Sequence, residues 1–205
     1  MASHEQIAMH HAIARIHRIQ IITIAWMSIE AAISLTAAWK ARSPALLAFG
    51  GDSGIELLSA VAVLWRFQVS GEPEHAETRA ARIAGALLFG LAAYVVTASI
   101  LTLRGYAQPK TTYLGMGILI AAVLFMPWLA VQKRKLSSAT NSPALRADAA
   151  ESALCAYFSA VALMGVAINA IWHIRWADPV AALVITPLII WEGQEAIRGK
   201  SCHCS

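Results

Sequence analysis

Six long apolar stretches follow one another along the chain, separated by short polar connections. We place them at residues 19–39, 44–67, 80–103, 111–132, 144–172 and 177–197. Each is long enough to cross a bilayer, because a helix needs about 20 apolar residues to span a hydrocarbon core of roughly 30 Å. The pattern predicts an all-α polytopic membrane protein with six transmembrane helices. This domain would cover residues 19–198, between a polar segment at 1–18 and a short Cys/His tail at 199–205.

Composition supports a chain that lies in lipid. Of the 205 residues, 58% are hydrophobic and only 14% are charged, whereas soluble domains carry about 25% charged residues. Three cysteines are too few for a disulfide framework. The net charge of +4 is distributed in a way that indicates membrane orientation rather than a nucleic-acid partner.

The positive charges predict the orientation. Residues 1–18 lack the apolar core and cleavage site of a signal peptide, so we expect them to be retained. Most of the 16 lysines and arginines fall on the side of the N-terminus, and the strongest cluster is at 133–135. By the positive-inside rule both termini are expected in the cytoplasm, with the protein in the cell (inner) membrane.

A short internal repeat is visible at an offset of 99 residues. The letters Ser-Pro-Ala-Leu open the second stretch at 43–46 and the fifth at 142–145. The offset aligns Asp52 with Glu151 and Glu56 with Cys155. The fifth stretch comes three places after the second, so the two copies would run in opposite directions and form an inverted 3+3 repeat. Such repeats place the substrate site near the bilayer midplane.

Acidic residues inside the apolar stretches are the main candidates for function. Asp52 and Glu56 are spaced i, i+4 and share one helix face, as do Glu151 and Cys155. Carboxylates at this depth are costly unless they are paired, protonated or bound to an ion, and we find no lysine or arginine in the interior of these helices to pair with them. Two facing pairs would supply four ligands for a tetrahedral divalent ion. The alternatives are acids that only join helices by hydrogen bonds and, for Cys155, a small hydrophobic filler.

Two further acids have open roles. Asp148 lies one turn before the pair in the fifth stretch and either supports the ligands, caps the helix or pairs with Arg146. Glu30 lies in the middle of the first stretch, on one face with Thr23 and Ser34, which suggests that this face looks inward. Glu30 either carries protons or is a hydrogen-bonded packing residue.

Other features carry weaker signals. We interpret Asp178, which precedes a proline, as the cap of the sixth helix. Glycines such as Gly50 and Gly54 would permit close helix contacts. The Cys202-His203-Cys204 tail has too few ligands to close a metal site alone and would at most capture or transfer an ion.

Three motifs in order resemble the membrane domain of the cation diffusion facilitator family, over roughly residues 15–198. They are the run at 43–56, the Arg-Ala-Asp-Ala-Ala-Glu sequence at 146–151, and the Trp-Ala-Asp-Pro sequence at 176–179. The chain resembles a short form of the family, one without the C-terminal cytoplasmic domain.

The resemblance implies proton-coupled efflux of a divalent metal, most often zinc, by alternating access in a homodimer. Carried over by position, the transport site is Asp52, Glu56, Glu151 and Cys155. Glu151 stands where the family has histidine, and Cys155 stands where it has aspartate. The metal is cargo, so no cofactor is expected, and the family consists of transporters rather than enzymes.

Several alternatives remain at this stage. Cysteine favours zinc or cadmium, while three carboxylates would suit manganese or ferrous iron. A non-transporting membrane protein that binds metal or acts as a scaffold would show saturable binding without flux. An intramembrane enzyme finds no support, because none of the familiar protease or phosphate-binding motifs is present.

Overall fold

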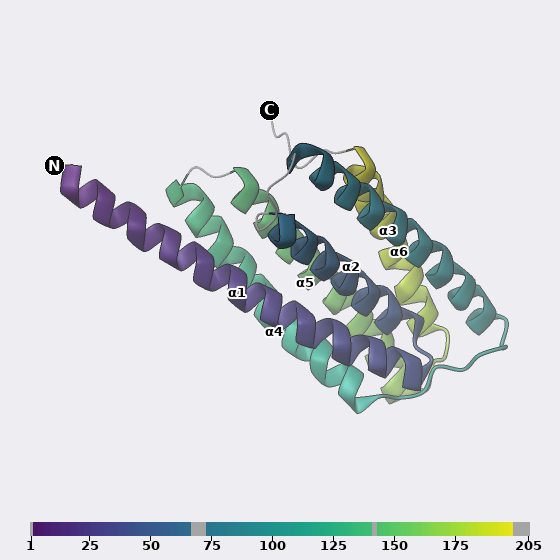
Figure 1. Ribbon diagram of the computed structural model, residues 1–205. Coiled ribbons are helices and arrows are strands. Elements are labelled where there is room, and N and C mark those ends of the chain that lie inside the picture. Colours follow the sequence, from purple (N-terminus) through teal and green to yellow (C-terminus); the bar gives the residue numbers. More distant parts are fainter. Residues whose placement is uncertain (1, 67–72, 141–142, 199–205) are drawn as a thin grey trace.

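The structure, a computed structural model, describes the backbone of residues 2–66, 73–140 and 143–198. These residues form six helices (Figure 1). Their bounds are α1 Ala2–Ala41, α2 Pro44–Arg66, α3 Pro73–Leu103, α4 Tyr113–Thr140, α5 Pro143–Trp172 and α6 Ala177–Arg198. Five of them, all except α2, are long and apolar enough to cross a membrane. The predicted all-α membrane fold is therefore confirmed, while the Cys202-His203-Cys204 tail lies outside the described residues.

Several helices extend beyond the apolar stretches that predicted them. Helix α1 begins at Ala2 rather than at residue 19, α3 begins at Pro73 rather than at 80, and α4 continues to Thr140 rather than ending at 132. Hydrophobicity marks only the part of a helix that suits lipid, because polar residues such as Glu, Gln and Lys are equally good helix formers. The polar ends therefore continue as helix.

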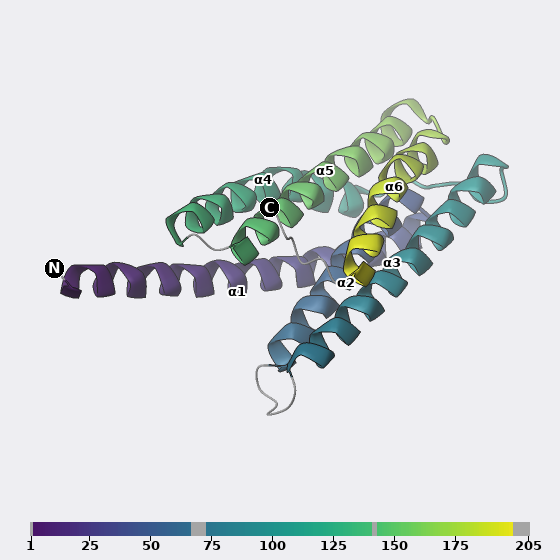
Figure 2. The ribbon, with the colours of Figure 1, turned by 90° about the horizontal axis from the view of Figure 1, so that it is seen from above.

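The helices lie side by side, and successive ones run in opposite directions (Figure 1). Helix α4 packs against α1 and α5, while α3 packs against α2 and α6. Phe49, Phe158 and Ile185 are fully buried in one apolar cluster that joins α2, α5 and α6. Seen from above, α2 and α3 diverge from α4 and α5 toward the end of the bundle where α1 begins (Figure 2). We call this the N-terminal end.

The opposite end of the bundle is held by Asp178. Its carboxylate accepts hydrogen bonds from the hydroxyl of Ser43 and from the backbone N–H of Ala45, at 3.1 Å for the latter. The sequence predicted a cap for the sixth helix, but this side chain caps the start of α2 instead. The beginnings of α2 and α6 are thereby joined, and the two helices run in the same direction from this point. Farther along, α6 contains Pro187.

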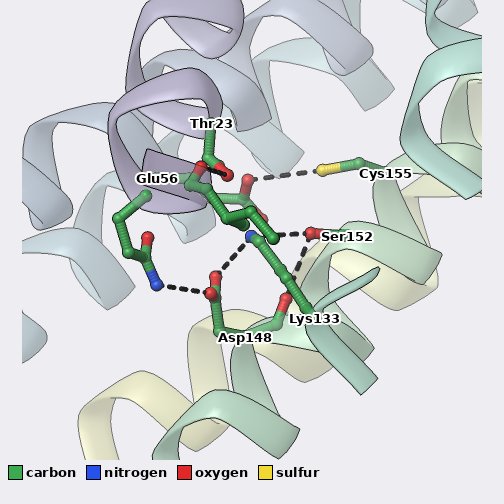
Figure 3. A network of polar contacts seen from close by, with 8 residues as sticks. Thr23, Glu56, Lys133, Asp148, Ser152 and Cys155 are labelled. Carbon is green, nitrogen blue, oxygen red and sulfur yellow. Dashed lines mark hydrogen bonds and ion pairs between the residues drawn. The ribbon is translucent and has the colours of Figure 1, made fainter. Parts of the chain in front are cut away.

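Near the N-terminal end, a polar network joins three helices. Lys133 of α4 is 1% exposed, and its Nζ donates to Asp148 of α5 at 2.7 Å and to Ser152 at 2.9 Å (Figure 3). Gln20 of α1 donates to the other oxygen of Asp148 at 2.7 Å. The sequence indicated no lysine or arginine that could pair with the acids inside the helices. For Asp148 that prediction was wrong, because α4 continues past its apolar stretch and turns the side chain of Lys133 inward onto it.

Close packing of α1 on α2 depends on one glycine. A Cβ at Gly50 would lie 2.7 Å from the Cβ of Ser34 and 3.0 Å from the backbone nitrogen of Leu35. A Cβ at Gly54, one turn later, would have as its nearest neighbour a methyl group of Leu35 at 3.9 Å. The two glycines therefore differ, and only Gly50 sets the distance between the helices.

We predict opposite effects of alanine at these two positions. Gly50→Ala should force α1 and α2 apart and destabilise the fold by about 1–3 kcal/mol, as overpacking does. Gly54→Ala should be neutral or stabilising by up to about 1 kcal/mol, because alanine favours helix. Denaturation midpoints of the purified protein in detergent measure both. Equal destabilisation by the two substitutions would contradict the packing described.

We also predict that the Lys133 network stabilises the fold. Lys133→Met should leave one oxygen of Asp148 without its donor and cost about 1–3 kcal/mol. Asp148 is a quarter exposed and keeps Gln20, so the loss should lie toward the lower end. The exposed Lys135 provides the control, since Lys135→Met should leave the denaturation midpoint unchanged. Identical midpoints for both variants would show that the buried pair contributes nothing.

Candidate metal centre

Two side chains of α2 and one of α5 meet in the middle of the bundle. Asp52, Glu56 and Cys155 each offer one ligand atom, and these atoms lie within 4.8 Å of one another. Asp52 is 1% exposed and Cys155 2%, and Glu56 is half-buried. Glu56 and Cys155 each lie 12 residues beyond the proline that starts their helix, or about 18 Å along it. Because α2 and α5 start from opposite ends, the group lies near the midpoint of both.

One direct contact links the two helices at this point. The thiol of Cys155 donates to Oε2 of Glu56 at 3.3 Å (Figure 3). The two residues are 99 positions apart, which is the offset of the internal repeat, so this aligned pair meets in space. Thiolate and carboxylate are both ligands of zinc. Within the described part of the chain, the ion pair of Lys133 with Asp148 does not involve any of the three, so no lysine or arginine neutralises them.

The structure does not bring Glu151 into this group. Glu151 is exposed and lies one turn before Cys155 on α5, nearer to the N-terminal end of the bundle, where α5 begins. It remains within electrostatic range of Glu56. Asp148, one turn farther still, is engaged with Lys133 rather than with Arg146. Of the two aligned pairs, therefore, Glu56 with Cys155 makes contact and Asp52 with Glu151 does not.

Sequence reasoning missed Glu192 of α6. Its carboxyl group lies close to those of Asp52 and Glu56. The signal that could have found Glu192 was available, since it is an acid inside the sixth apolar stretch. An ionisable residue inside a membrane-spanning stretch is a candidate for function, and this holds for Glu192 as it does for Asp52.

Glu30 of α1 lies beside the group and is fully buried. Its two oxygens accept hydrogen bonds from Nε1 of Trp26 at 2.6 Å and from the hydroxyl of Ser53 at 2.8 Å. Thr23 and Ser34 on the same helix are also buried, so the prediction that this face looks inward is confirmed. Glu30 thus links α1 to Ser53, the residue after Asp52 on α2. Both of its carboxylate oxygens have hydrogen-bond donors within the protein.

Comparison with known proteins gives two matches. The model of the cation efflux transmembrane domain matches residues 20–199. Over 157 residues the chain is 26% identical to the uncharacterized transporter YdbO of Bacillus subtilis (strain 168), a match that covers 72% of this chain and 54% of that protein. The chain thus spans about half the length of the curated relative it matches.

Proposed function

The chain belongs to the cation efflux family, and from this premise we propose that it exports divalent metal cations, with zinc as the main cargo. The observation that carries the proposal is the buried group of Asp52, Glu56 and Cys155, whose ligand atoms lie within 4.8 Å of one another. Carboxylates buried without a cation are costly, and a bound divalent ion removes that cost. The group lies near the middle of two helices that start at opposite ends, and inverted-repeat transporters hold their substrate at such a central position.

The choice of zinc follows from the ligand types. A thiolate selects thiophilic ions such as zinc and cadmium, whereas carboxylates alone would suit manganese or ferrous iron. Cys155 lies inside the group and contacts Glu56, so we assign it as a ligand. Metal ligands bind in their deprotonated form, so protons and metal compete for the same atoms, and a proton gradient would drive export.

We propose that Glu151 lies on the path by which the ion reaches the site. Its exposed side chain lies toward the N-terminal end of the bundle, which the positive-inside rule assigns to the cytoplasm. An ion arriving from that side would meet Glu151 one turn before Cys155. We further propose a homodimer in the inner membrane, with both termini in the cytoplasm and Glu30 on a proton pathway.

We predict that Asp52→Asn abolishes transport. Asparagine keeps the shape of the side chain but removes the charge that binds the ion, so zinc flux should fall at least about tenfold. Flux into proteoliposomes with an imposed pH gradient measures this. The control is Glu195→Gln, an acid of α6 outside the group, which should transport as the wild type does. Normal flux in Asp52→Asn would refute the site, and saturable binding without flux in the wild type would favour a non-transporting metal-binding protein.

We predict that Cys155 sets the preference among metals. In a background with serine at both tail cysteines, Cys155→Asp should lower zinc and cadmium affinity and maintain or raise manganese affinity, because an all-oxygen site favours harder ions. Titration of the purified protein with each ion, compared with the same background carrying Cys155, measures the shift. An unchanged ratio of cadmium to manganese affinity would exclude the thiol as a ligand.

A further inference from the structure

One positive charge is buried inside the bundle. Among the side chains that the structure describes, Lys133 is the only buried lysine or arginine. Its Nζ donates to Oδ1 of Asp148 at 2.7 Å and to the hydroxyl of Ser152 at 2.9 Å (Figure 3). Apolar side chains in place of a buried ion pair are often at least as stabilising. Stability alone therefore does not explain why a lysine stands here.

The ammonium group of Lys133 lies where a second cation would otherwise bind. Asp148 and Glu151 are spaced i, i+3 on α5, so their carboxylates project from neighbouring positions on one face. The two acids and Lys133 interact electrostatically. Carboxylate oxygens are the ligands that hard divalent cations prefer. Without Lys133, Asp148 and Glu151 would form an acidic pair with no positive charge beside it.

This acidic pair lies on the path that we propose for the ion. Glu151 is exposed and Asp148 is a quarter exposed, and both precede Cys155 on α5, nearer to the N-terminal end of the bundle. An ion that enters from that end would meet them before it reaches Glu56 and Cys155. If the pair held the ion there, the ion would be delayed before the centre.

We propose that Lys133 is a tethered cation that keeps Asp148 and Glu151 from retaining a divalent ion at the entry. It acts through these two acids and is a positioning residue, not a ligand. With Lys133 in place, the three charges sum to at most one negative charge, which attracts a cation. Without it the sum would reach two, enough to hold a divalent ion. The inference rests on the proposed function, which brings the ion past this point.

The alternative is that Lys133 only ties α4 to α5. Two substitutions separate this structural role from the role of the charge. Lys133→Gln removes the charge but keeps an N–H donor for Asp148 or Ser152, whereas Lys133→Arg keeps the charge. A purely structural role predicts changes in stability but no change in the number of ions bound.

The experiment counts the manganese ions bound by the full chain, purified without metal, with serine at both tail cysteines. Manganese suits oxygen ligands, and binding is followed up to about 1 mM, where weak carboxylate sites fill. We expect Lys133→Gln to bind one more ion per chain than the same background with Lys133. That additional ion should be lost when Glu151→Gln is combined with Lys133→Gln. Lys133→Arg and the exposed control Lys135→Met should bind no additional ion.

The outcomes separate this inference from the proposed function. Melting of the metal-free proteins shows which variants are folded, and Lys133→Met takes the place of Lys133→Gln where the latter does not fold. An unchanged number of ions without the charge of Lys133 overturns the inference, as does an additional ion that persists with Glu151→Gln or arises in Lys133→Arg. None of these results affects the transport proposal. A wild-type protein that neither binds nor moves a divalent metal would instead contradict the proposed function itself.

Discussion

An acid buried among apolar helices needs a partner, and the way each acid meets this need organises the bundle. Asp148 has Lys133. Asp178 has a hydroxyl group and a backbone amide, and Glu30 has an indole and a hydroxyl group. These three acids are satisfied by the protein itself and hold helices together.

The remaining buried acids meet the need differently. Glu56 accepts a hydrogen bond from the thiol of Cys155, and Glu192 lies close to Asp52. Oδ1 of Asp52 and Oε1 of Glu192 are buried without a hydrogen-bond partner among the described residues. Grouping like charges in a low dielectric is unfavourable for folding alone. The acids described above have hydrogen-bond donors or a lysine from the protein, whereas this group lacks a positive charge to balance it. A bound cation would supply that charge, which is the physical reason to regard the group as a binding site.

Much of this arrangement could be predicted from the sequence. The length of the apolar stretches predicted six helices. A chain segment inside lipid has to form a helix or a closed barrel, because exposing unpaired backbone groups to lipid is costly. The spacing of Asp52 and Glu56 placed both on one face, and the repeat offset predicted the contact between Glu56 and Cys155. These features depend on helix geometry alone.

What could not be predicted depends on how the helices rotate and tilt against one another. Lys133 follows an apolar stretch and was taken for a membrane anchor, but α4 turns it inward onto Asp148. Glu151 shares a face with Cys155, yet it lies one turn nearer to the start of α5 and is exposed. The acid close to Asp52 comes from α6, which the repeat does not align with α2. Pairings of this kind arise from the packing of whole helices, which no spacing within one helix reveals.

The proline within α6 has a mechanical consequence. Pro187 lies between Asp178, which fastens the beginning of the helix to α2, and Glu192, which reaches the centre. Proline removes one rung of the helical ladder, and just before it the hydroxyl of Thr186 donates to the carbonyl of Ala182 at 2.8 Å. One half of α6 is thus clamped and the other half is attached through a weakened joint. A bend of α6 at Pro187 would move the carboxyl group of Glu192 relative to Asp52 while the start of the helix stays joined to α2.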